Sequence, residues 1–140
     1  MTQIVWNDSL SIGVPLIDGQ HKMLLEKLNA ITQAVERNQG VPKIIKTLDF
    51  MIDYTEFHFT DEERHMAETG YPGLAKQREQ HAEFKVTLNN LVQDFEEEGA
   101  TTSLAEAINV FLFNWLVTHI KGSDVQFGKY LEEKGIDLTE

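Results

Sequence analysis

Four of the five histidines interrupt apolar helical patterns, where an ionisable side chain is costly unless it is paired or bound to a metal ion. They are His21, His58, His81 and His119, and they fall on four successive predicted helices, one on each. A single histidine on an apolar face is usually a core residue that a neighbour satisfies. Four of them on facing helices instead indicate a metal site inside a helical bundle.

Two carboxylates accompany these histidines. Glu62 lies in an acidic run, but it is the member of that run that shares a helix face with His58, four residues earlier. Asp124 follows His119 by five residues. On a straight helix this spacing places Asp124 about 140° away from His119, which favours an ordinary exposed aspartate. A helix that ends near Gly122 would allow Asp124 to return to the face of His119.

The number and kind of these side chains restrict how many metal ions, and which ones, the site could bind. Four imidazoles and two carboxylates exceed the four ligands of a tetrahedral zinc site, so two metal ions that share bridging carboxylates fit better. The chain has no cysteine, which excludes disulfides, iron–sulfur clusters and thiolate zinc sites. Nitrogen and oxygen ligands suit iron, manganese or zinc, and the spacing does not choose between them.

The helices that must position these side chains are predicted from the periodicity of the apolar residues. The first predicted helix begins at a cap, Asp18, and ends at the stop signal of residues 38–40. The second begins at Pro42 and ends at the turn of residues 69–72. Its apolar stripe runs through Ile45, Leu48, Ile52, Phe59 and Met66.

The third predicted helix, residues 74–98, has the clearest seam, with steps of three and four residues. The seam consists of Leu74, Gln77, His81, Phe84, Leu88, Leu91 and Phe95. The fourth predicted helix begins near a capping box, Ser103 and Glu106, and closes at Lys121–Gly122. A short last helix is expected at residues 125–131.

Four such stripes joined by short loops predict an all-α fold, an up-down-up-down antiparallel four-helix bundle. We expect a single domain over residues 1–140, because this length builds one core. Within it, residues 1–17 form an irregular N-terminal arm, residues 18–121 form the bundle and residues 122–140 form a C-terminal segment with a short helix.

Charge and hydropathy exclude several classes of partner. The chain has 12 basic and 23 acidic residues, a formal net charge of -11, which repels nucleic acid and anionic membrane surfaces. No apolar run approaches the roughly 20 residues that span a bilayer, and the N-terminus lacks the features of a secretory signal. We therefore expect a cytoplasmic protein, a monomer or weak oligomer, with no nucleic-acid or membrane partner.

Several motifs together resemble a known family. They are Ile4-Val5-Trp6, Ile12-Gly13-Val14, Ile17-Asp18 and Gln20-His21-Lys22 near the start, His58-Phe59-Thr60-Asp61-Glu62-Glu63, the turn Gly70-Tyr71-Pro72, and Trp115-Leu116-Val117-Thr118-His119-Ile120 with Asp124. This series is similar to the hemerythrins, in particular the short bacterial ones. The resemblance covers nearly the whole chain.

The resemblance implies a non-haem centre of two iron ions with a bridging oxo or hydroxo group. It implies that Glu62 and Asp124 bridge the two ions. His21 and His58 would be the remaining protein ligands of the ion that has an open coordination position. His81 and His119 would bind the other ion. The implied partner is O2, bound reversibly at the open position.

The implied role is therefore oxygen storage, delivery or sensing. In such a protein the chain would orient the ligands and keep the pocket dry. Candidates for the apolar lining are Leu25, Trp115 and Ile120, which equally suit the ordinary core of a bundle.

The chain departs from the family pattern at Gln77, where the family normally has a further histidine four residues before His81. The Gln77 amide oxygen could ligate the metal weakly, or a water could take the position. His65 could supply the imidazole or hydrogen-bond to Gln77, but we favour a partly exposed histidine beside Arg64. Because of Gln77, a di-iron oxidase or peroxidase and an iron-handling protein remain alternatives to O2 binding.

Overall fold

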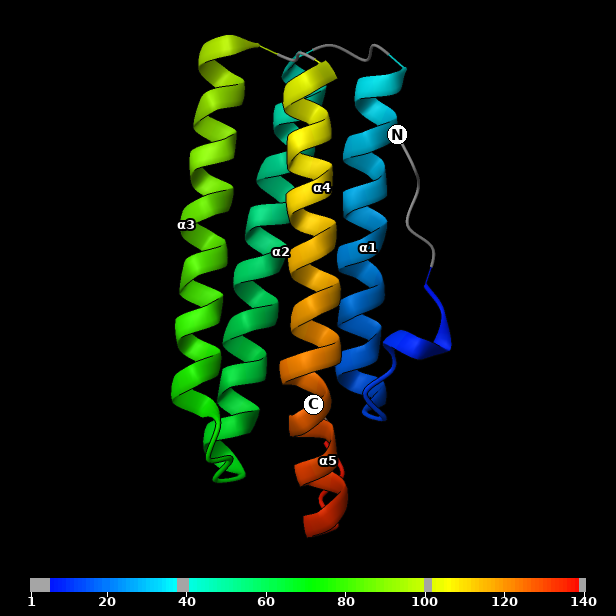
Figure 1. Cartoon of the computed structure of the whole chain (residues 1–140), viewed down its shortest axis with the longest axis vertical. Helices are drawn as coiled ribbons and strands as arrows, with labels where there is room; N and C mark the ends of the chain where they lie inside the picture. Colours follow the sequence, from blue (N-terminus) through cyan, green and yellow to red (C-terminus); the bar gives the residue numbers. More distant parts are fainter. Residues whose placement is uncertain (1–5, 38–40, 100–101, 139–140) are drawn as a thin grey trace.

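Four long antiparallel helices form the bundle that the sequence predicts (Figure 1). The structure is a computed structural model that describes residues 6–37, 41–99 and 102–138, and describes only the backbone of residues 35, 36, 41, 102–106, 108 and 109. The helices are α1 (Pro15–Glu36), α2 (Val41–Glu68), α3 (Leu74–Glu98) and α4 (Thr102–His119). The side chains of the predicted capping box, Ser103 and Glu106, lie outside the described residues.

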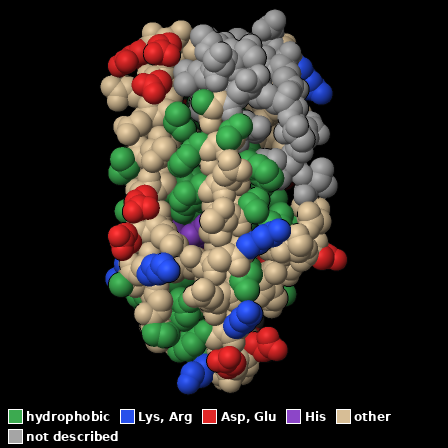
Figure 2. Space-filling model, in the orientation of Figure 1, with side chains coloured by type: hydrophobic (Ala, Val, Ile, Leu, Met, Phe, Trp, Pro, Cys, Tyr) green, Lys and Arg blue, Asp and Glu red, His purple; other side chains and the backbone are tan. Residues whose placement is uncertain are grey.

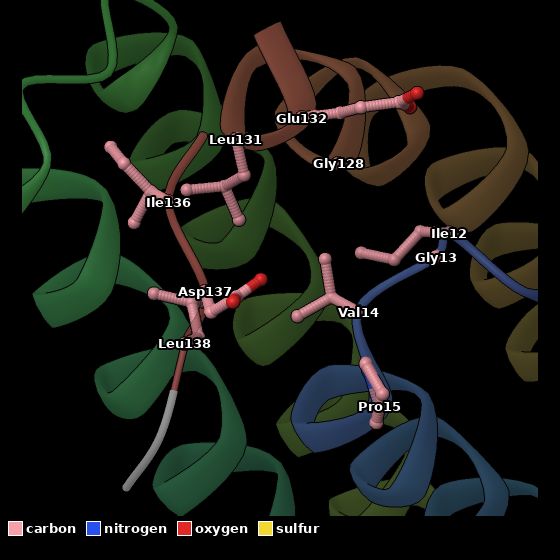
Figure 3. A pocket seen from close by; sticks show the side chains of 10 residues that line it. All are labelled: Ile12, Gly13, Val14, Pro15, Gly128, Leu131, Glu132, Ile136, Asp137 and Leu138. Atoms are coloured by element: carbon pink, nitrogen blue, oxygen red, sulfur yellow. The ribbon is translucent and has the colours of Figure 1, made fainter. Parts of the chain in front are cut away.

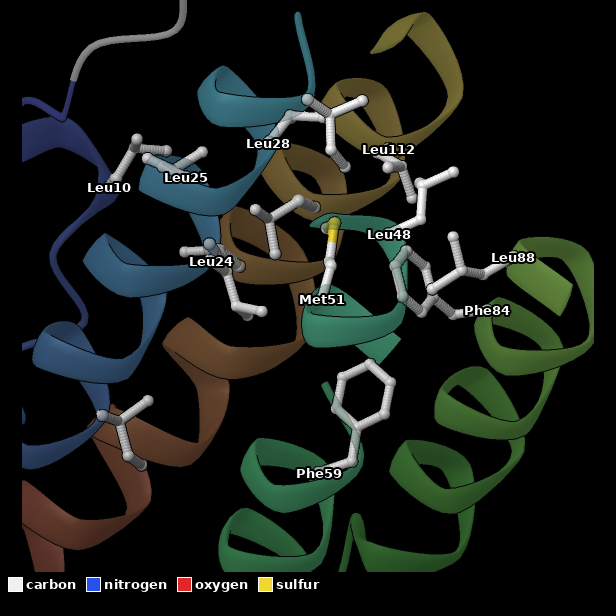
Figure 4. Packing of buried hydrophobic residues seen from close by; sticks show 14 of the residues in the cluster. Leu10, Leu24, Leu25, Leu28, Leu48, Met51, Phe59, Phe84, Leu88 and Leu112 are labelled. Atoms are coloured by element: carbon white, nitrogen blue, oxygen red, sulfur yellow. The ribbon is translucent and has the colours of Figure 1, made fainter. Parts of the chain in front are cut away.

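Buried apolar side chains lie on both sides of the histidines along the bundle (Figure 4 shows part of this core). Toward the C-terminal ends of α1 and α3, the fully buried ones include Leu28, Ile31, Ile44, Leu48, Met51, Leu88 and Phe95. Toward the other end they include Ile17, Met66 and Phe127. None of the helices in the described part of the chain is long and apolar enough to cross a membrane.

The seam of α2 agrees in part with the predicted one. Leu48, Phe59 and Met66 are buried as predicted, whereas Ile45 and Ile52 are only partly buried and Ile44 and Met51 are buried instead. From Ile44 one row of buried positions continues in steps of three and four through Leu48, Met51, Thr55, His58, Glu62 and His65. The prediction missed part of this row because it followed apolar residues alone.

The start of α1 also differs from the prediction. The helix begins at Pro15, whose fixed backbone angle suits a first turn, and Asp18 lies inside it. The Asp18 carboxylate accepts hydrogen bonds from the Ile12 backbone N–H (2.9 Å) and from the Ser11 hydroxyl (2.6 Å). Asp18 is therefore not the helix cap. It connects the N-terminal arm to the first turn of α1.

The end of α4 is continuous with the C-terminal helix. The predicted stop at Lys121–Gly122 is wrong, because residues 120–124 form a π-helical turn, η2 (Ile120–Asp124), that leads directly into α5 (Val125–Lys134). In η2 the Val125 backbone N–H donates to the Ile120 carbonyl, five residues earlier. Gly135, with a φ of 66°, then ends α5.

The N-terminal arm packs against α5. The arm contains a short 3-10 turn, η1 (Asp8–Leu10), and continues to Ile12, whose carbonyl lies close to Gly128 of α5. Beside this contact, the arm and the end of α5 enclose a cavity of ≈ 340 Å³ that Val14, Leu131 and Ile136 help to line (Figure 3). Close approach of two backbones requires a residue without a side chain at Gly128.

We predict that Gly128→Ala destabilises the protein. An added Cβ would lie 2.2 Å from the Ile12 carbonyl oxygen, so the arm must move away from α5. Overpacking of this kind lowers the free energy of unfolding by about 1–3 kcal/mol, which urea titration followed by circular dichroism would measure.

The matched control is Gly19→Ala in α1, where an added Cβ meets no atom within 4 Å. Alanine at this exposed helical position should raise the free energy of unfolding by about 0.5–1 kcal/mol. Equal effects of the two substitutions would contradict the proposed packing of the arm.

Candidate metal centre

Six predicted ligands meet in one buried layer of the bundle. Each of the four helices contributes one histidine, α2 adds Glu62 and η2 adds Asp124. None of the six is more than 5% exposed. The structure therefore brings together side chains that lie as far apart in the sequence as His21 and Asp124.

The first group contains His21, His58, Glu62 and Asp124, and one ligand atom of each lies within 4.8 Å of the others. The Nε2 atom of His21 is 3.1 Å from Asp124 Oδ2 and 3.8 Å from Glu62 Oε2. The Nε2 atom of His58 is 3.4 Å from the same Glu62 oxygen. These atoms converge on a point between α1, α2 and η2.

The second group contains Glu62, His81 and His119. The two imidazole Nε2 atoms are 3.2 Å apart, and His81 Nε2 is 3.4 Å from Glu62 Oε1. Asp124 Oδ1 is 3.2 Å from His119 Nε2. Both carboxylates thus direct one oxygen to each group, which is the geometry of a bridging ligand.

The π-helical turn explains how Asp124 reaches this layer. On an α-helix, a residue five positions after His119 would face away from it. In η2 the hydrogen bonds span five residues instead of four, so five residues complete about one turn. Asp124 is consequently fully buried and close to His119, and the sequence-based expectation of an exposed aspartate is wrong.

Several atoms of this layer lack hydrogen-bond partners among the described residues. They are both ring nitrogens of His21, both Glu62 oxygens, Asp124 Oδ2 and Gln77 Oε1. Buried polar groups almost always have a partner, and an unpaired buried group costs about 1–3 kcal/mol. The imidazole and carboxylate atoms are the donors that a divalent transition metal takes, so this layer fits metal ions well.

Neighbouring side chains orient two of the imidazoles. The Nδ1–H of His58 donates to Gln20 Oε1 at 2.7 Å, while Gln20 Nε2 donates to Asp61 at 2.9 Å. The Nδ1–H of His81 donates to Glu63 Oε2 at 2.8 Å. With the proton on Nδ1, each ring presents the lone pair of Nε2 to the carboxylates, as metal binding requires.

The electrostatics of the layer favour neutral imidazoles. Burial lowers the pKa of His81 to about 4, and burial with the nearby His21 lowers the pKa of His58 well below its ordinary value. Both rings are therefore neutral near pH 7.

The two carboxyl groups have opposite shifts. Burial and the adjacent Asp124 raise the pKa of Glu62 well above its ordinary value. Burial also opposes ionisation of Asp124, but contacts with His119 and His21 outweigh it and hold its pKa well below the ordinary value. A metal ion would supply the positive charge that lets both ionise, because bound carboxylates are deprotonated.

Aromatic rings form the walls of the layer. The Phe59 ring stacks on His81 with a centroid distance of 3.9 Å, and the Trp115 ring stacks on His119 at 4.4 Å. Phe59 and Trp115 also line a small apolar cavity of ≈ 10 Å³ with Leu24 (Figure 4 shows Leu24 and Phe59). Leu25 and Ile120 are buried, but they do not line this cavity.

Gln77 and His65 are two further polar side chains of the bundle interior. Gln77 is buried and its Nε2 donates to Asp124 Oδ1 at 3.0 Å. His65 is also buried, so the expectation of partial exposure is wrong. Its Nε2 lies 3.5 Å from Asp61 Oδ2 and 3.3 Å from Arg64, and His65 belongs to neither group of candidate ligands in the described structure.

The sequence reasoning missed three side chains of the site. Gln20 appeared only as the neighbour of His21, Glu63 only as a member of an acidic run, and Phe59 only as a core residue. A signal for Glu63 existed in its spacing, because it immediately follows Glu62 on the helix side that faces His81. No comparable signal distinguished Gln20.

Comparisons with known proteins agree with this geometry. Residues 12–131 match the family model described as hemerythrin HHE cation binding domain. A bacteriohemerythrin from Stenotrophomonas maltophilia is 33% identical over 89% of this chain and 78% of that protein. A myohemerythrin from Riftia pachyptila is 29% identical over 88% of this chain and 89% of its own length.

Solved structures show the same fold. A crystal structure of wild-type hemerythrin has a TM-score of 0.82 and is 26% identical, with 91% of this chain and 97% of that chain covered. The matched residues include both carboxylates and all four histidines of the buried layer. From the family match over most of its length and from its fold, the chain belongs to the hemerythrin family.

Proposed function

We propose that this chain binds O2 reversibly at a centre of two non-haem iron ions. The observation that carries the proposal is the pair of buried ligand groups that share Glu62. Relatives named bacteriohemerythrin and myohemerythrin support the same function. Two ferrous ions, when bound, supply the electrons and the coordination position that O2 requires.

The protein would hold the two ions with six side chains. His21 and His58 serve the first ion, His81 and His119 serve the second, and two carboxylates bridge them. The two ionised carboxylates would offset half of the four positive charges of two ferrous ions, and a bridging hydroxo group would offset one more. The proposed bridging role is supported by the position of one oxygen of each carboxylate in each group.

The surrounding residues would favour reversible O2 binding over irreversible oxidation of the iron ions. The polar partners of His58 and His81 restrict movement of these rings, which preserves the spacing of the two ions. The small cavity beside the layer is lined mainly by apolar side chains, which disfavours water there. Exclusion of water and protons slows the irreversible oxidation of a ferrous centre.

The first prediction concerns metal content and O2. After anaerobic addition of ferrous iron, metal analysis should find two iron ions per chain. Exposure to O2 should produce a visible absorption band that disappears when O2 is removed. Immediate conversion to a stable ferric form would instead support the oxidase or peroxidase alternative, and rapid exchange of a single ion would support iron handling.

The second prediction concerns the shared carboxylate. Glu62→Gln keeps the size of the side chain but removes the charge that both ligand groups use. The variant should stay helical by circular dichroism and lose most of its bound iron. The control is His65→Leu, a buried residue of the same helix outside both groups, which should retain iron and its absorption spectrum.

The third prediction concerns the partner of His58. Gln20→Leu removes the acceptor of the Nδ1–H bond and should lower iron affinity by about 10- to 100-fold, measured by competition with a chelator. Gln93→Leu is a matched control, because Gln93 is exposed on α3 and its amide nitrogen donates to the exposed Glu97 of the same helix. Unchanged affinity in Gln20→Leu would contradict a positioning role for Gln20.

A further inference from the structure

The second ligand group leaves part of a metal ion's coordination unfilled. It offers four protein donors, which are its two histidines and one oxygen each of Glu62 and Asp124. Two histidines with carboxylate ligands form a set that leaves open positions on a non-haem iron ion. The first group offers the same number of donors, so the surroundings of the second group distinguish it.

Gln77 occupies the side of the second group that a further ligand would need. It lies four residues before His81, on the same face of α3, and it is buried. Its amide nitrogen donates to Asp124 Oδ1 at 3.0 Å, so this side chain contacts a candidate ligand of the metal. Its Oε1 has no hydrogen-bond partner among the described residues.

A groove between α3 and α4 connects the His119 side of the layer with solvent. It has a volume of ≈ 450 Å³, and His119 and Trp115 line it together with polar side chains that include Asn114, Thr118 and Ser123. Figure 2 shows a histidine side chain reaching the surface between these two helices.

The lining of the groove indicates the chemistry of a ligand. Amide and hydroxyl groups of Gln80, Asn114, Thr118 and Ser123 can hydrogen-bond a small polar molecule, and the Ser123 hydroxyl donates to Gln80 Oε1 at 2.8 Å. Glu83 is an exposed carboxylate at the same groove, which disfavours highly charged anions. Small neutral or monoanionic donors fit best.

We propose that the second metal ion keeps one coordination position that the protein does not fill, and that a small lone-pair donor from solvent takes it through the groove between α3 and α4. The donor is water, hydroxide or a monodentate anion such as azide. Gln77 then acts as a positioning residue that holds Asp124, and it is not a ligand. The inference rests on the proposed di-iron centre.

Titration of the iron-loaded ferric protein with azide tests the inference. Calorimetry, with iron counted in the same sample, should find two azide ions bound per chain, one at each metal ion. Gln77→His adds an imidazole that fills the position at the second ion, so this variant should bind one azide. Both readouts are binding stoichiometries and do not depend on O2 chemistry.

A substitution in the groove tests whether azide reaches the second ion by this route. Asn114→Trp fills the groove with a large side chain, so one of the two azide-binding phases should slow at least several-fold while the stoichiometry stays at two. Asn89→Trp is the matched control, because Asn89 is exposed on α3 and does not line the groove. The control should leave both phases unchanged.

Three results would overturn the inference. One azide per chain in the unmodified protein, rising to two in Gln77→Ala, would show that Gln77 itself is the ligand. Equal rates in Asn114→Trp and the unmodified protein would exclude the groove as the route. Failure to bind two iron ions would remove the proposed function as well, whereas two ions with a single azide site would remove the inference alone.

Discussion

The main physical constraint on this structure is the free-energy cost of burying two carboxylates and four imidazoles away from water. Glu62 and Asp124 are completely buried, and three of their four oxygens have no hydrogen-bond partner among the described residues. Such groups are unfavourable unless positive charge accompanies them. The rest of the layer is arranged around this requirement. Imidazoles surround both carboxylates, and polar side chains orient the rings of His58 and His81.

Apolar packing on both sides of this layer stabilises the bundle. Leu28, Leu48 and Leu88 are buried on one side, and Ile17, Met66 and Phe127 are buried on the other. The seam of α2 keeps the same steps of three and four residues from Ile44 to His65. A regular seam therefore positions His58 and Glu62 as rigidly as it positions Leu48.

The parts that sequence reasoning predicted are those that periodicity controls. Helix number, antiparallel order and the convergence of His21, His58, His81 and His119 all follow from side chains that repeat along one helix face. The remaining features depend on contacts between segments or on a local change of helix type. The π-helical turn before Asp124 leaves no pattern of its own, because its residues are compatible with a regular helix.

The π-helical turn η2 also limits the insertions and deletions that this chain can accept during evolution. The widened turn η2 places Asp124 in the layer, and the same continuous helix brings Gly128 against the N-terminal arm. Deletion of one residue in this segment would restore a regular helix and rotate everything after it by about 100°. The carboxylate of Asp124 and the contact between Gly128 and the N-terminal arm would be lost together. We therefore expect insertions and deletions to accumulate in the interhelical loops and to be absent from η2.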